Sequence, residues 1–390
     1  MIFETIKELI IRHKVSLSLT TLGALLISFF FLSLFTEKRP VPPKSEIRSE
    51  LKDFYRSSLL PDYQKGYYVD SDGSGNSETQ SYALLQSYLV GDKETFDRVW
   101  KWTKENLQRK EDHLFAWKYY YPLKKKIEIA DRGSAADADT DIAFALVRAG
   151  EDWMNPEYIK EALLIINGIW NAETTEFLGK RYPLAGNWAN LEQYLVLNPS
   201  YFSPAAYRTF AKYDIDHDWQ SLVSDQYEIL EKISFGKFRE KSSLFLPPNW
   251  VVLDKKTNDF SKYTGKKDSF DYSYDAFRTF WRVALDQALY PNAQAMAFLT
   301  KAKMFEEKWK KGYQICSIYK FSGENYSCEM DVAALAGPLS IFSITNVNLA
   351  NELIKKYYLT FDNKLNLPRY SPFFHKSWYW FGLALWAGFK

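Results

Sequence analysis

Three aspartates open a helix-like run in the stretch Ala135-Ala-Asp-Ala-Asp-Thr-Asp-Ile-Ala143. A second acidic stretch, Ser77-Glu-Thr-Gln-Ser-Tyr82, opens another such run, and both lie among tyrosines and tryptophans. Acid groups at a helix start often do no more than satisfy free backbone N–H groups and the helix dipole. Acid groups beside aromatic platforms are also what the hydrolysis of a sugar chain requires. The rest of the chain must decide between these two interpretations.

Apolar residues recur at helical spacing along most of the chain. The spacing predicts two helices over 82–107, broken at Gly91-Asp92, and one over 141–149 that ends at Gly150. Strand-like runs are few and short. Paired helices without a short-period repeat predict one all-α domain of stacked helical hairpins. Further helices are predicted at 158–170, 218–233, 274–288, 292–310, 331–341, 346–359 and 377–388.

Composition narrows the class of function. The 390 residues carry a formal net charge of +2, which gives no electrostatic case for nucleic acid. With four His, two Cys and neither HExxH nor CxxC, we predict no metal site and no cofactor. Aromatic residues make up 17% of the chain, and such a surplus suits a cleft that stacks sugar rings. Cys316 and Cys328 share a loop-like stretch, and whether they pair is left open.

The N-terminal part predicts a membrane anchor. Residues 15–36 carry no charge over a length that matches a membrane-crossing helix, and basic residues precede them. Because bulky and charged residues occupy the zone where a cleavage site would lie, an uncleaved anchor is favoured over a cleaved signal peptide. Residues 1–14 are then a cytoplasmic tail, and the proline-containing 37–49 an extended tether. The chain is then expected to be a single-pass membrane protein, with residues 50–390 as its domain outside the cytoplasm.

Residues 135–153 resemble the signature of glycoside hydrolase family 8. In that signature an Asp, then Ala or Gly, and then a second Asp are followed by Ile-Ala and, farther on, by an aromatic residue. Other segments resemble that family in the same order. The resemblance covers about residues 70–390. It implies an (α/α)6 barrel of inner and outer helices and inverting hydrolysis of a β-1,4-linked glycan, with a cellulose-like chain favoured. These other segments are 77–82, 114–117, 198–204 with 217–219, and 272–282.

The resemblance also implies roles for the acids. Inverting cleavage needs a general acid on the leaving oxygen and a general base that activates water on the opposite face of the sugar. Glu78 matches the family's general acid, so we expect its surroundings to raise its pKa. Asp275 matches the general base. Asp137 matches the residue that binds and distorts the sugar, with Asp139 as a second substrate-binding candidate, while Asp141 is predicted to be a helix cap.

Further residues are candidates for contact with the sugar. Arg278, one helical turn after Asp275, is expected to orient that carboxylate. Other tryptophans at helical spacing are assigned to the core, and His217 and Asp218 to a structural pair rather than a metal site. The candidates for stacking on the sugar are Trp117, Trp188, Tyr201 and Tyr274; the core tryptophans are Trp100, Trp102 and Trp153.

Several positions depart from the family pattern. The family usually has Gly-x-Gly-Tyr-Gly where this chain has Thr79, Ser81 and Ala83, and Ala136 and Phe280 also differ from it. These departures predict a remodelled central subsite. They keep open an alternative, a catalytically weak or inactive glycan-binding protein of the same fold. A lyase or epimerase ranks last, because histidines are scarce and do not cluster with the acids. The predicted partners are a polysaccharide or oligosaccharide substrate, the membrane, and polysaccharide synthesis or export machinery.

Overall fold

The computed structural model describes residues 40–121, 126–238, 241–242, 244–328 and 331–390. The expected cytoplasmic tail at 1–14 and the expected membrane anchor at 15–36 lie outside the described residues. None of the helices in the described part of the chain combines the length and the hydropathy that a membrane crossing needs. Residues 43–390 form one compact unit.

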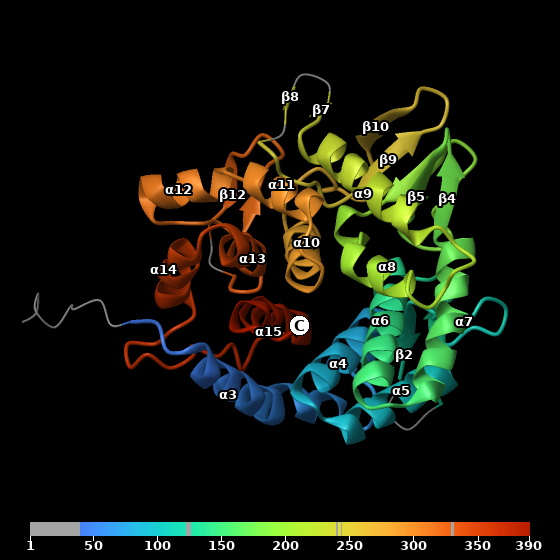
Figure 1. The fold of residues 1–390 in the computed structure, drawn as a ribbon, viewed down its shortest axis with the longest axis horizontal. Helices are drawn as coiled ribbons and strands as arrows, with labels where there is room; N and C mark the ends of the chain where they lie inside the picture. The colour runs from blue at the N-terminus through green and yellow to red at the C-terminus, as the bar shows by residue number, and fades with distance from the viewer. Residues whose placement is uncertain (1–39, 122–125, 239–240, 243, 329–330) are drawn as a thin grey trace, which may run out of the picture. The chain divides into compact units, whose positions relative to one another are not determined.

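Paired helices form a double ring in the described part of the chain, with one helix of each pair inside and its partner outside (Figure 1). Each inner helix contacts the next, and the last returns to the first and closes the ring. The mainly helical prediction is therefore confirmed. The inner helices are α4 (Ser77–Val90), α6 (Ala136–Asp152), α8 (Pro204–Phe210), α10 (Phe277–Leu289), α13 (Ala336–Thr345) and α15 (Phe373–Ala387). Their outer partners are α5 (Lys93–Leu107), α7 (Pro156–Ala172), α9 (Trp219–Ser234), α11 (Ala293–Lys301), α14 (Val347–Tyr357) and α3 (Lys44–Phe54).

The distribution of apolar residues decides which helices lie inside. An inner helix has neighbours on all sides, and α15 accordingly buries every residue from Lys376 to Ala387. An outer helix needs only one apolar face, and α5 buries a single stripe that includes Phe96, Val99 and Trp100. The predicted break between α4 and α5 is confirmed, because Gly91 ends α4 with a φ of 81° that glycine adopts readily.

Several predicted boundaries were wrong. Helix α6 begins at Ala136, so the acidic stretch lies inside its first turns, and it runs past Gly150. Gly150 is needed for close packing instead, since a Cβ there would lie 2.6 Å from Ile159 Cδ1. Residues 44–49 belong to α3 rather than to an extended tether, because Ile47 buries its side chain together with later residues of that helix. The helix predicted at 292–310 is divided into α11 and α12 (Met304–Gly312).

Short antiparallel strands lie around the ring of helices, and two of them adjoin residues of the candidate site. Strand β1 (Ser74–Asn76) leads directly into α4, and β9 (Val251–Asp254) follows Trp250. A disulfide joins Cys316 and Cys328 beside the last hairpin. The other strands are β2 (Lys118–Tyr120) and β3 (Glu128–Asp131) with β1; β6 (Tyr194–Leu197) and β10 (Asp259–Lys262) with β9; and the hairpins β4 (Thr174–Phe177) with β5 (Lys180–Pro183), β7 (Lys237–Phe238) with β8 (Lys241–Ser242), and β11 (Ile318–Tyr319) with β12 (Asn325–Ser327). Short π and 3₁₀ turns cover Tyr55–Leu59, Leu60–Tyr63 and Pro199–Tyr201.

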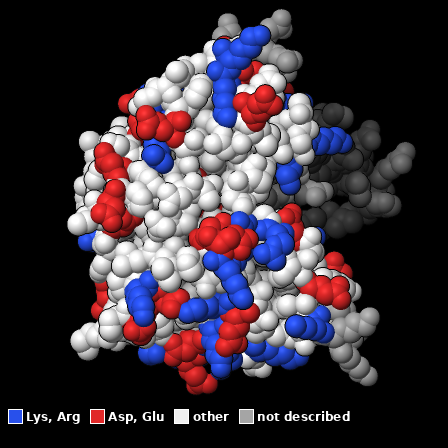
Figure 2. All heavy atoms as spheres, turned by 90° about the vertical axis from the view of Figure 1, so that its right-hand side faces the viewer, with Lys and Arg blue, Asp and Glu red and all other residues white. Residues whose placement is uncertain are grey.

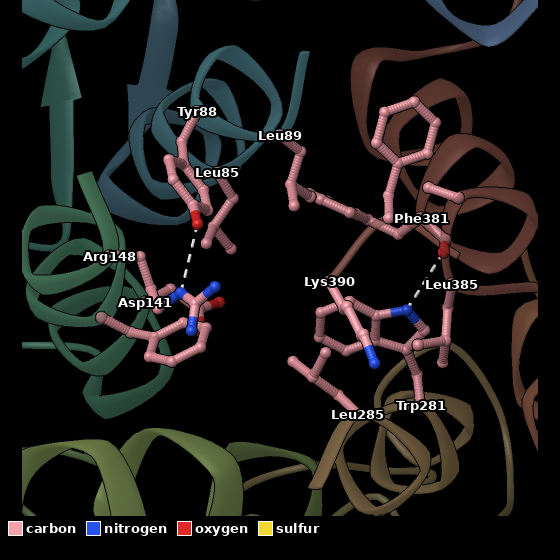
Figure 3. A pocket seen from close by; sticks show the side chains of 13 residues that line it. Leu85, Tyr88, Leu89, Asp141, Arg148, Trp281, Leu285, Phe381, Leu385 and Lys390 are labelled. Atoms are coloured by element: carbon pink, nitrogen blue, oxygen red, sulfur yellow. Dashed lines mark hydrogen bonds between the residues drawn. The ribbon is translucent and has the colours of Figure 1, made fainter. Parts of the chain in front are cut away.

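The inner helices run in parallel, so the barrel has two different ends. Toward their carboxyl ends they line a narrow apolar pocket that includes Leu85, Phe144 and Leu385. Lys390 lies at this pocket (Figure 3). Its Nζ donates to the carbonyl of Ala288. On the outer face shown in Figure 2, acidic and basic side chains are interspersed and neither sign forms a continuous patch.

Candidate active site

The amino ends of the inner helices meet at a cleft of about 900 Å³ that is partly open to solvent. Every predicted site residue except Asp137 and Asp139 lines it. The segments before α6 and at the starts of α4, α10 and α15 all contribute to its walls. The lining residues are Glu78, Trp117, Asp131, Gly133, Ser134, Ala135, Ala185, Trp188, Tyr201, Trp250, Tyr263, Lys266, Tyr274, Asp275, Arg278 and Phe374.

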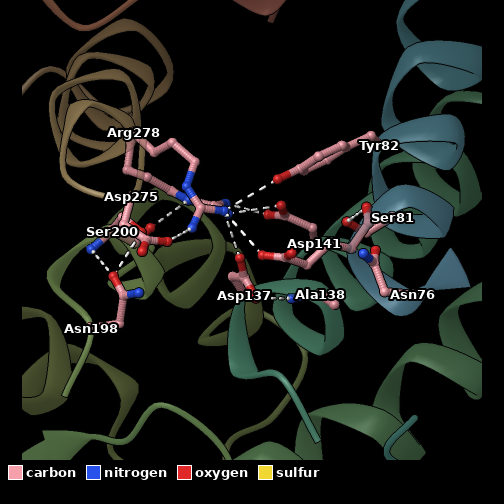
Figure 4. A network of polar contacts seen from close by, with 12 residues as sticks. Asn76, Ser81, Tyr82, Asp137, Ala138, Asp141, Asn198, Ser200, Asp275 and Arg278 are labelled. Carbon is pink, nitrogen blue, oxygen red and sulfur yellow. Dashed lines mark hydrogen bonds and ion pairs between the residues drawn. The ribbon is translucent and has the colours of Figure 1, made fainter. Parts of the chain in front are cut away.

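Arg278 is the centre of the polar network at the bottom of the cleft (Figure 4). Its Nη1 donates to Asp137 Oδ2 at 2.8 Å and to Glu78 Oε1 at 3.2 Å, and its Nη2 donates to Asp275 Oδ1 at 2.5 Å. The Arg278 side chain is only 2% exposed. One buried guanidinium therefore holds three carboxyls from three different inner helix starts, which the planar fork of arginine is suited to do.

The three carboxyls differ in their access to solvent. The side chains of Glu78 and Asp275 are 18% and 30% exposed and reach the cleft, whereas Asp137 is 1% exposed and lies behind them. Trp250 Nε1 also donates to Asp275 Oδ2 at 2.9 Å. Because the terminal nitrogens of a guanidinium lie about 2.3 Å apart, Glu78 Oε1 and Asp275 Oδ1 are at most about 8 Å from each other. The two exposed carboxyls thus face one region of the cleft.

The protonation of Glu78 differs from the sequence-based expectation. Burial raises its pKa, but the charge of Arg278 and hydrogen bonds with Asp137 and Arg278 outweigh burial, so the pKa of Glu78 is lowered. Burial and the neighbouring Glu78 charge instead raise the pKa of Asp137 well above its ordinary value. The expected rise in the pKa of Glu78 was wrong because its main partner in the structure is a cation. Two acids so close titrate as a pair, in which a proton is favoured on Asp137 over Glu78.

Hydrogen bonds to the backbone hold the turn that carries Glu78. Asn76 caps α4 by accepting from the Thr79 N–H at 2.9 Å, and Thr79 Oγ1 donates to the Asn76 carbonyl at 2.7 Å. Ser81 Oγ donates to the carbonyl of Glu78 at 2.8 Å. Thr79 and Ser81, which depart from the family pattern, therefore stabilise this turn.

We expect Asn76→Ala to lower both stability and turnover. Loss of this cap should cost about 1 kcal/mol of unfolding free energy and, by shifting Glu78, reduce kcat on a soluble glucan roughly tenfold. Asn155→Ala is the matched control, because Asn155 caps the outer helix α7 through the Glu157 N–H, away from the cleft. Chemical denaturation and initial rates would check both variants. Equal rates for the two variants would show that the α4 cap does not position Glu78.

The four predicted stacking residues, Trp117, Trp188, Tyr201 and Tyr274, all line the cleft. Trp188 and Tyr274 are 41% and 37% exposed, so their ring faces are accessible. The Trp188 ring lies 6.5 Å from the ring of Trp250, which in turn lies 5.8 Å from Tyr263. These three rings form a row along one wall. Such a row provides successive apolar platforms for a sugar chain.

The sequence-based prediction missed Trp250, Tyr263, Lys266 and Phe374. The only local signal for Trp250 was its place between the Pro247-Pro248-Asn249 turn and an apolar run that forms β9. Lys266 lies over the Trp250 ring at 5.6 Å. None of these residues falls within the segments that resemble the family, so no local pattern placed them near Asp275.

Helix geometry explains why Asp139 and Asp141 do not reach the cleft. Each residue turns about 100° around a helix, so Asp139 points away from Asp137, whereas Asp141 lies below Asp137 on the same face. Asp139 is fully buried and accepts from the Phe115 N–H at 2.9 Å, so its predicted place in the cleft was wrong. Asp141 is not a cap but pairs with both terminal nitrogens of Arg282, one turn below the Asp137–Arg278 contact.

Two structural assignments also need correction. His217 Nδ1 pairs with Asp214 Oδ2 at 2.7 Å, while Asp218 caps α9 through the Ser221 N–H. The two residues are therefore structural but do not pair with each other. Trp100 is buried as predicted, whereas Trp102 and Trp153 are only partly buried.

A helical barrel that brings two exposed carboxyls and a row of aromatic rings to one end of its inner helices is the arrangement of a glycoside hydrolase. Comparison with known proteins agrees. Residues 68–367 match the model of "Glycosyl hydrolases family 8", and the chain belongs to this family. The family resemblance is confirmed, and with it the enzyme class and the family's (α/α)6 fold.

The chain is similar to curated proteins described as endoglucanases. It is 34% identical over 215 residues to "Endoglucanase" of Cellulomonas uda, a match covering 54% of this chain and 56% of that protein. It is 28% identical over 344 residues to "Endoglucanase A" of Acetivibrio thermocellus, covering 82% of this chain and 67% of that protein. The matched region thus spans between about half and two thirds of these relatives.

Solved structures share the fold. The endoglucanase Cel10 of Klebsiella pneumoniae superimposes with a TM-score of 0.69 at 24% identity, over 86% of this chain and 98% of that chain. The β-1,3-1,4-glucanase of Paenibacillus sp. X4 does so with a TM-score of 0.76 at 20% identity, over 90% of this chain and 95% of that chain. At this level of identity the likeness shows the fold alone.

Proposed function

We propose that this chain is an inverting endo-glycosidase that hydrolyses a β-1,4-linked glycan, with a cellulose-like chain as its substrate. The observation that carries the proposal is the bridge from Glu78 through Arg278 to Asp275 inside an aromatic-lined cleft. Inverting glycosidases hold their two carboxyls roughly 6.5–9.5 Å apart to admit a water, a range that overlaps the upper bound of about 8 Å found here. The descriptions of the curated relatives as endoglucanases support the choice of substrate.

In this mechanism Glu78 protonates the leaving oxygen and Asp275 accepts a proton from the attacking water. Two donors, Arg278 and Trp250, keep Asp275 oriented. Asp137 supplies the shared proton. Because Asp137 and Glu78 are hydrogen-bonded to each other, this proton can move to Glu78, where the reaction needs it.

The proposal is tested by the products of hydrolysis. The chain is incubated with carboxymethyl cellulose, mixed-linkage glucan, chitosan and xylan, and reducing ends are counted. NMR of freshly cut cello-oligosaccharides then identifies the first-formed anomer. We expect cleavage of the glucans with the α-anomer appearing first. Retaining enzymes hold their two carboxyls about 5–5.5 Å apart, and the upper limit of about 8 Å between Glu78 and Asp275 allows that separation too. The anomer therefore decides, and a β-anomer formed first would refute inversion. Absence of cleavage on every glycan would refute hydrolysis.

A second function, glycan binding with little or no turnover, is favoured by one observation. The pKa of Asp137 is raised by burial and by the Glu78 charge, while Arg278 lowers the pKa of the proposed acid Glu78, so a proton is favoured on Asp137. If substrate did not move this proton, Glu78 would stay ionised and could not protonate the leaving group. Retardation of the chain in gels containing intact polysaccharide, without any released reducing ends, would support this alternative.

We further propose that residues 15–36 anchor the protein in the cytoplasmic membrane with its catalytic domain outside. The uncharged run in the sequence and the Cys316–Cys328 disulfide support this placement, since disulfides persist in oxidising compartments. An anchored hydrolase would act on a polymer close to machinery that synthesises or exports it. Alkaline carbonate should leave the full chain in the membrane, and protease added outside spheroplasts should digest the domain. Release by carbonate, or full protection from the protease, would contradict the proposal.

A further inference from the structure

A second buried pair of carboxyls lies under one wall of the cleft and takes no part in the proposed mechanism. Asp139 comes from α6 and Glu173 from the end of α7, and both are at most 1% exposed. Asp139 Oδ1 accepts from the Phe115 N–H at 2.9 Å, and Glu173 Oε1 accepts from Ser134 Oγ at 2.5 Å. Each acid thus has one oxygen satisfied by the surrounding protein.

The remaining oxygens of the two acids require a proton. Asp139 Oδ2 and Glu173 Oε2 are buried and accept from no other N–H or O–H of the described residues. The two side chains are instead within hydrogen-bonding reach of each other. Two carboxylates cannot hydrogen-bond unless one carries a proton. The Asp139–Glu173 pair therefore shares one.

On its Glu173 side the pair holds the segment that carries Trp188. Ser134 Oγ, which donates to Glu173, accepts from the Asn187 N–H at 3.0 Å, and the Ser134 carbonyl accepts from Trp188 Nε1 at 3.1 Å. The two segments touch so closely that a Cβ on Gly186 would lie 2.3 Å from the Ser134 carbonyl oxygen. The position of Trp188 thus depends on Ser134, and that of Ser134 on Glu173.

On its Asp139 side the pair holds the segment that carries Trp117. The Phe115 N–H bonded to Asp139 lies two residues before Trp117, and the Trp117 N–H donates to the Gly133 carbonyl at 2.7 Å. Gly133 adjoins Ser134, so both sides of the pair meet at one loop. Trp117 and Trp188 both line the cleft. The pair lies at the junction between the two tryptophan-bearing segments.

We propose that Asp139 and Glu173 are positioning residues that, by sharing one proton, hold Trp117 and Trp188 at the spacing a glycan chain requires. The inference rests on the proposed function, because the ligand it names is the glycan of that function. Loss of the proton leaves two buried carboxylates in contact, whose repulsion separates the two segments. Glycan binding should then weaken while the chemistry at Glu78 and Asp275 is retained.

The surroundings of the pair set the pH window. Burial raises the pKa of Glu173 to about 7, and burial together with the Glu173 charge raises the pKa of Asp139 well above its ordinary value. The other titratable groups facing the pair are Asp112, Arg109, which is paired with Asp112, and Tyr207. Glu173 is therefore the first of the two to lose its proton as pH rises through about 7, and Asp139 keeps the proton that the two acids then share. Because the folded chain binds more protons than the unfolded chain above about pH 4, its stability falls as pH rises from about 4 through 7.

The test measures the Kd for cellohexaose by calorimetry at pH 7.5, above the pKa of Glu173, in a Glu78→Gln background that prevents cleavage. Glu173→Gln keeps the acceptor for Ser134 and offers Asp139 an N–H, so its Kd should stay within about twofold of that of the reference chain. Glu173→Ala removes both contacts and should bind about tenfold more weakly than the reference.

Asp286→Asn is the matched control, because Asp286 is a buried acid of α10 that binds Arg208 and Tyr227 away from the cleft. It should lower the melting temperature but keep the Kd of the reference chain. The inference is overturned if Glu173→Gln binds as weakly as Glu173→Ala, if Glu173→Ala binds like the reference, or if cellohexaose does not bind at all. A chain that gives the expected Kd values but, with Glu78 intact, cuts no glycan would refute the proposed function alone.

Discussion

Glu78→Gln is expected to lower kcat on carboxymethyl cellulose by about 10³- to 10⁴-fold, the upper part of the range for loss of a general acid. The amide keeps the size of the side chain and can still accept from Arg278 Nη1, so the cleft should keep its shape. It cannot protonate the leaving oxygen. Cellohexaose should therefore still bind with nearly the wild-type Kd, while reducing ends no longer accumulate.

The nature of the leaving group makes this prediction specific to an acid. A dinitrophenyl cello-oligosaccharide needs little protonation to depart, so Glu78→Gln should lose much less activity on it than on the polymer. Asp275→Asn should lose similar activity on both substrates, because water must be activated in either case. Glu94→Gln, on the exposed face of α5, serves as the control and should match wild type. Equal losses of Glu78→Gln on both substrates would remove Glu78 from the role of acid.

Arg278→Met is expected to have the largest effect on stability. It leaves Glu78, Asp137 and Asp275 close together without their common cation. Breaking a buried ion pair from one side costs about 3–5 kcal/mol, so the unfolding free energy at pH 7 should fall by this amount. Hydrolysis should be lost, because Asp275 also loses its orienting partner.

The loss of stability in Arg278→Met should depend on pH. Without the guanidinium, burial is expected to raise the pKa values of Glu78 and Asp137 above those in the unfolded chain. The folded variant then binds more protons than the unfolded one above about pH 4, so its stability falls as pH rises. Urea denaturation at pH 4.5 and 7 should show a smaller deficit at pH 4.5. Arg208→Met, which removes a partner of Asp286 between α8 and α10 and away from the cleft, should be active. A deficit independent of pH would contradict this account.

Local patterns in the sequence predicted most of the fold. The helical spacing of apolar residues, the capping residues before helices and Gly91 between α4 and α5 act over a few residues, so they can be read directly. The family resemblance added Glu78 and Asp275, and the structure brings both to the cleft. What could not be read were contacts between distant segments, such as Trp250 with Asp275 and Asp139 with Glu173.

The acidic stretch at residues 135–143 illustrates which properties the sequence determines and which the tertiary structure decides. The sequence alone determined that three aspartates lie at or just before the start of a helix and that this segment belongs to a family 8 glycoside hydrolase. Only the tertiary structure decided their separate roles. Asp137 meets Arg278, Asp139 meets Glu173 and Asp141 meets Arg282. A helix turns each successive side chain toward a different neighbour, and those neighbours come from distant parts of the chain, so burial and partner charge set what each acid can do.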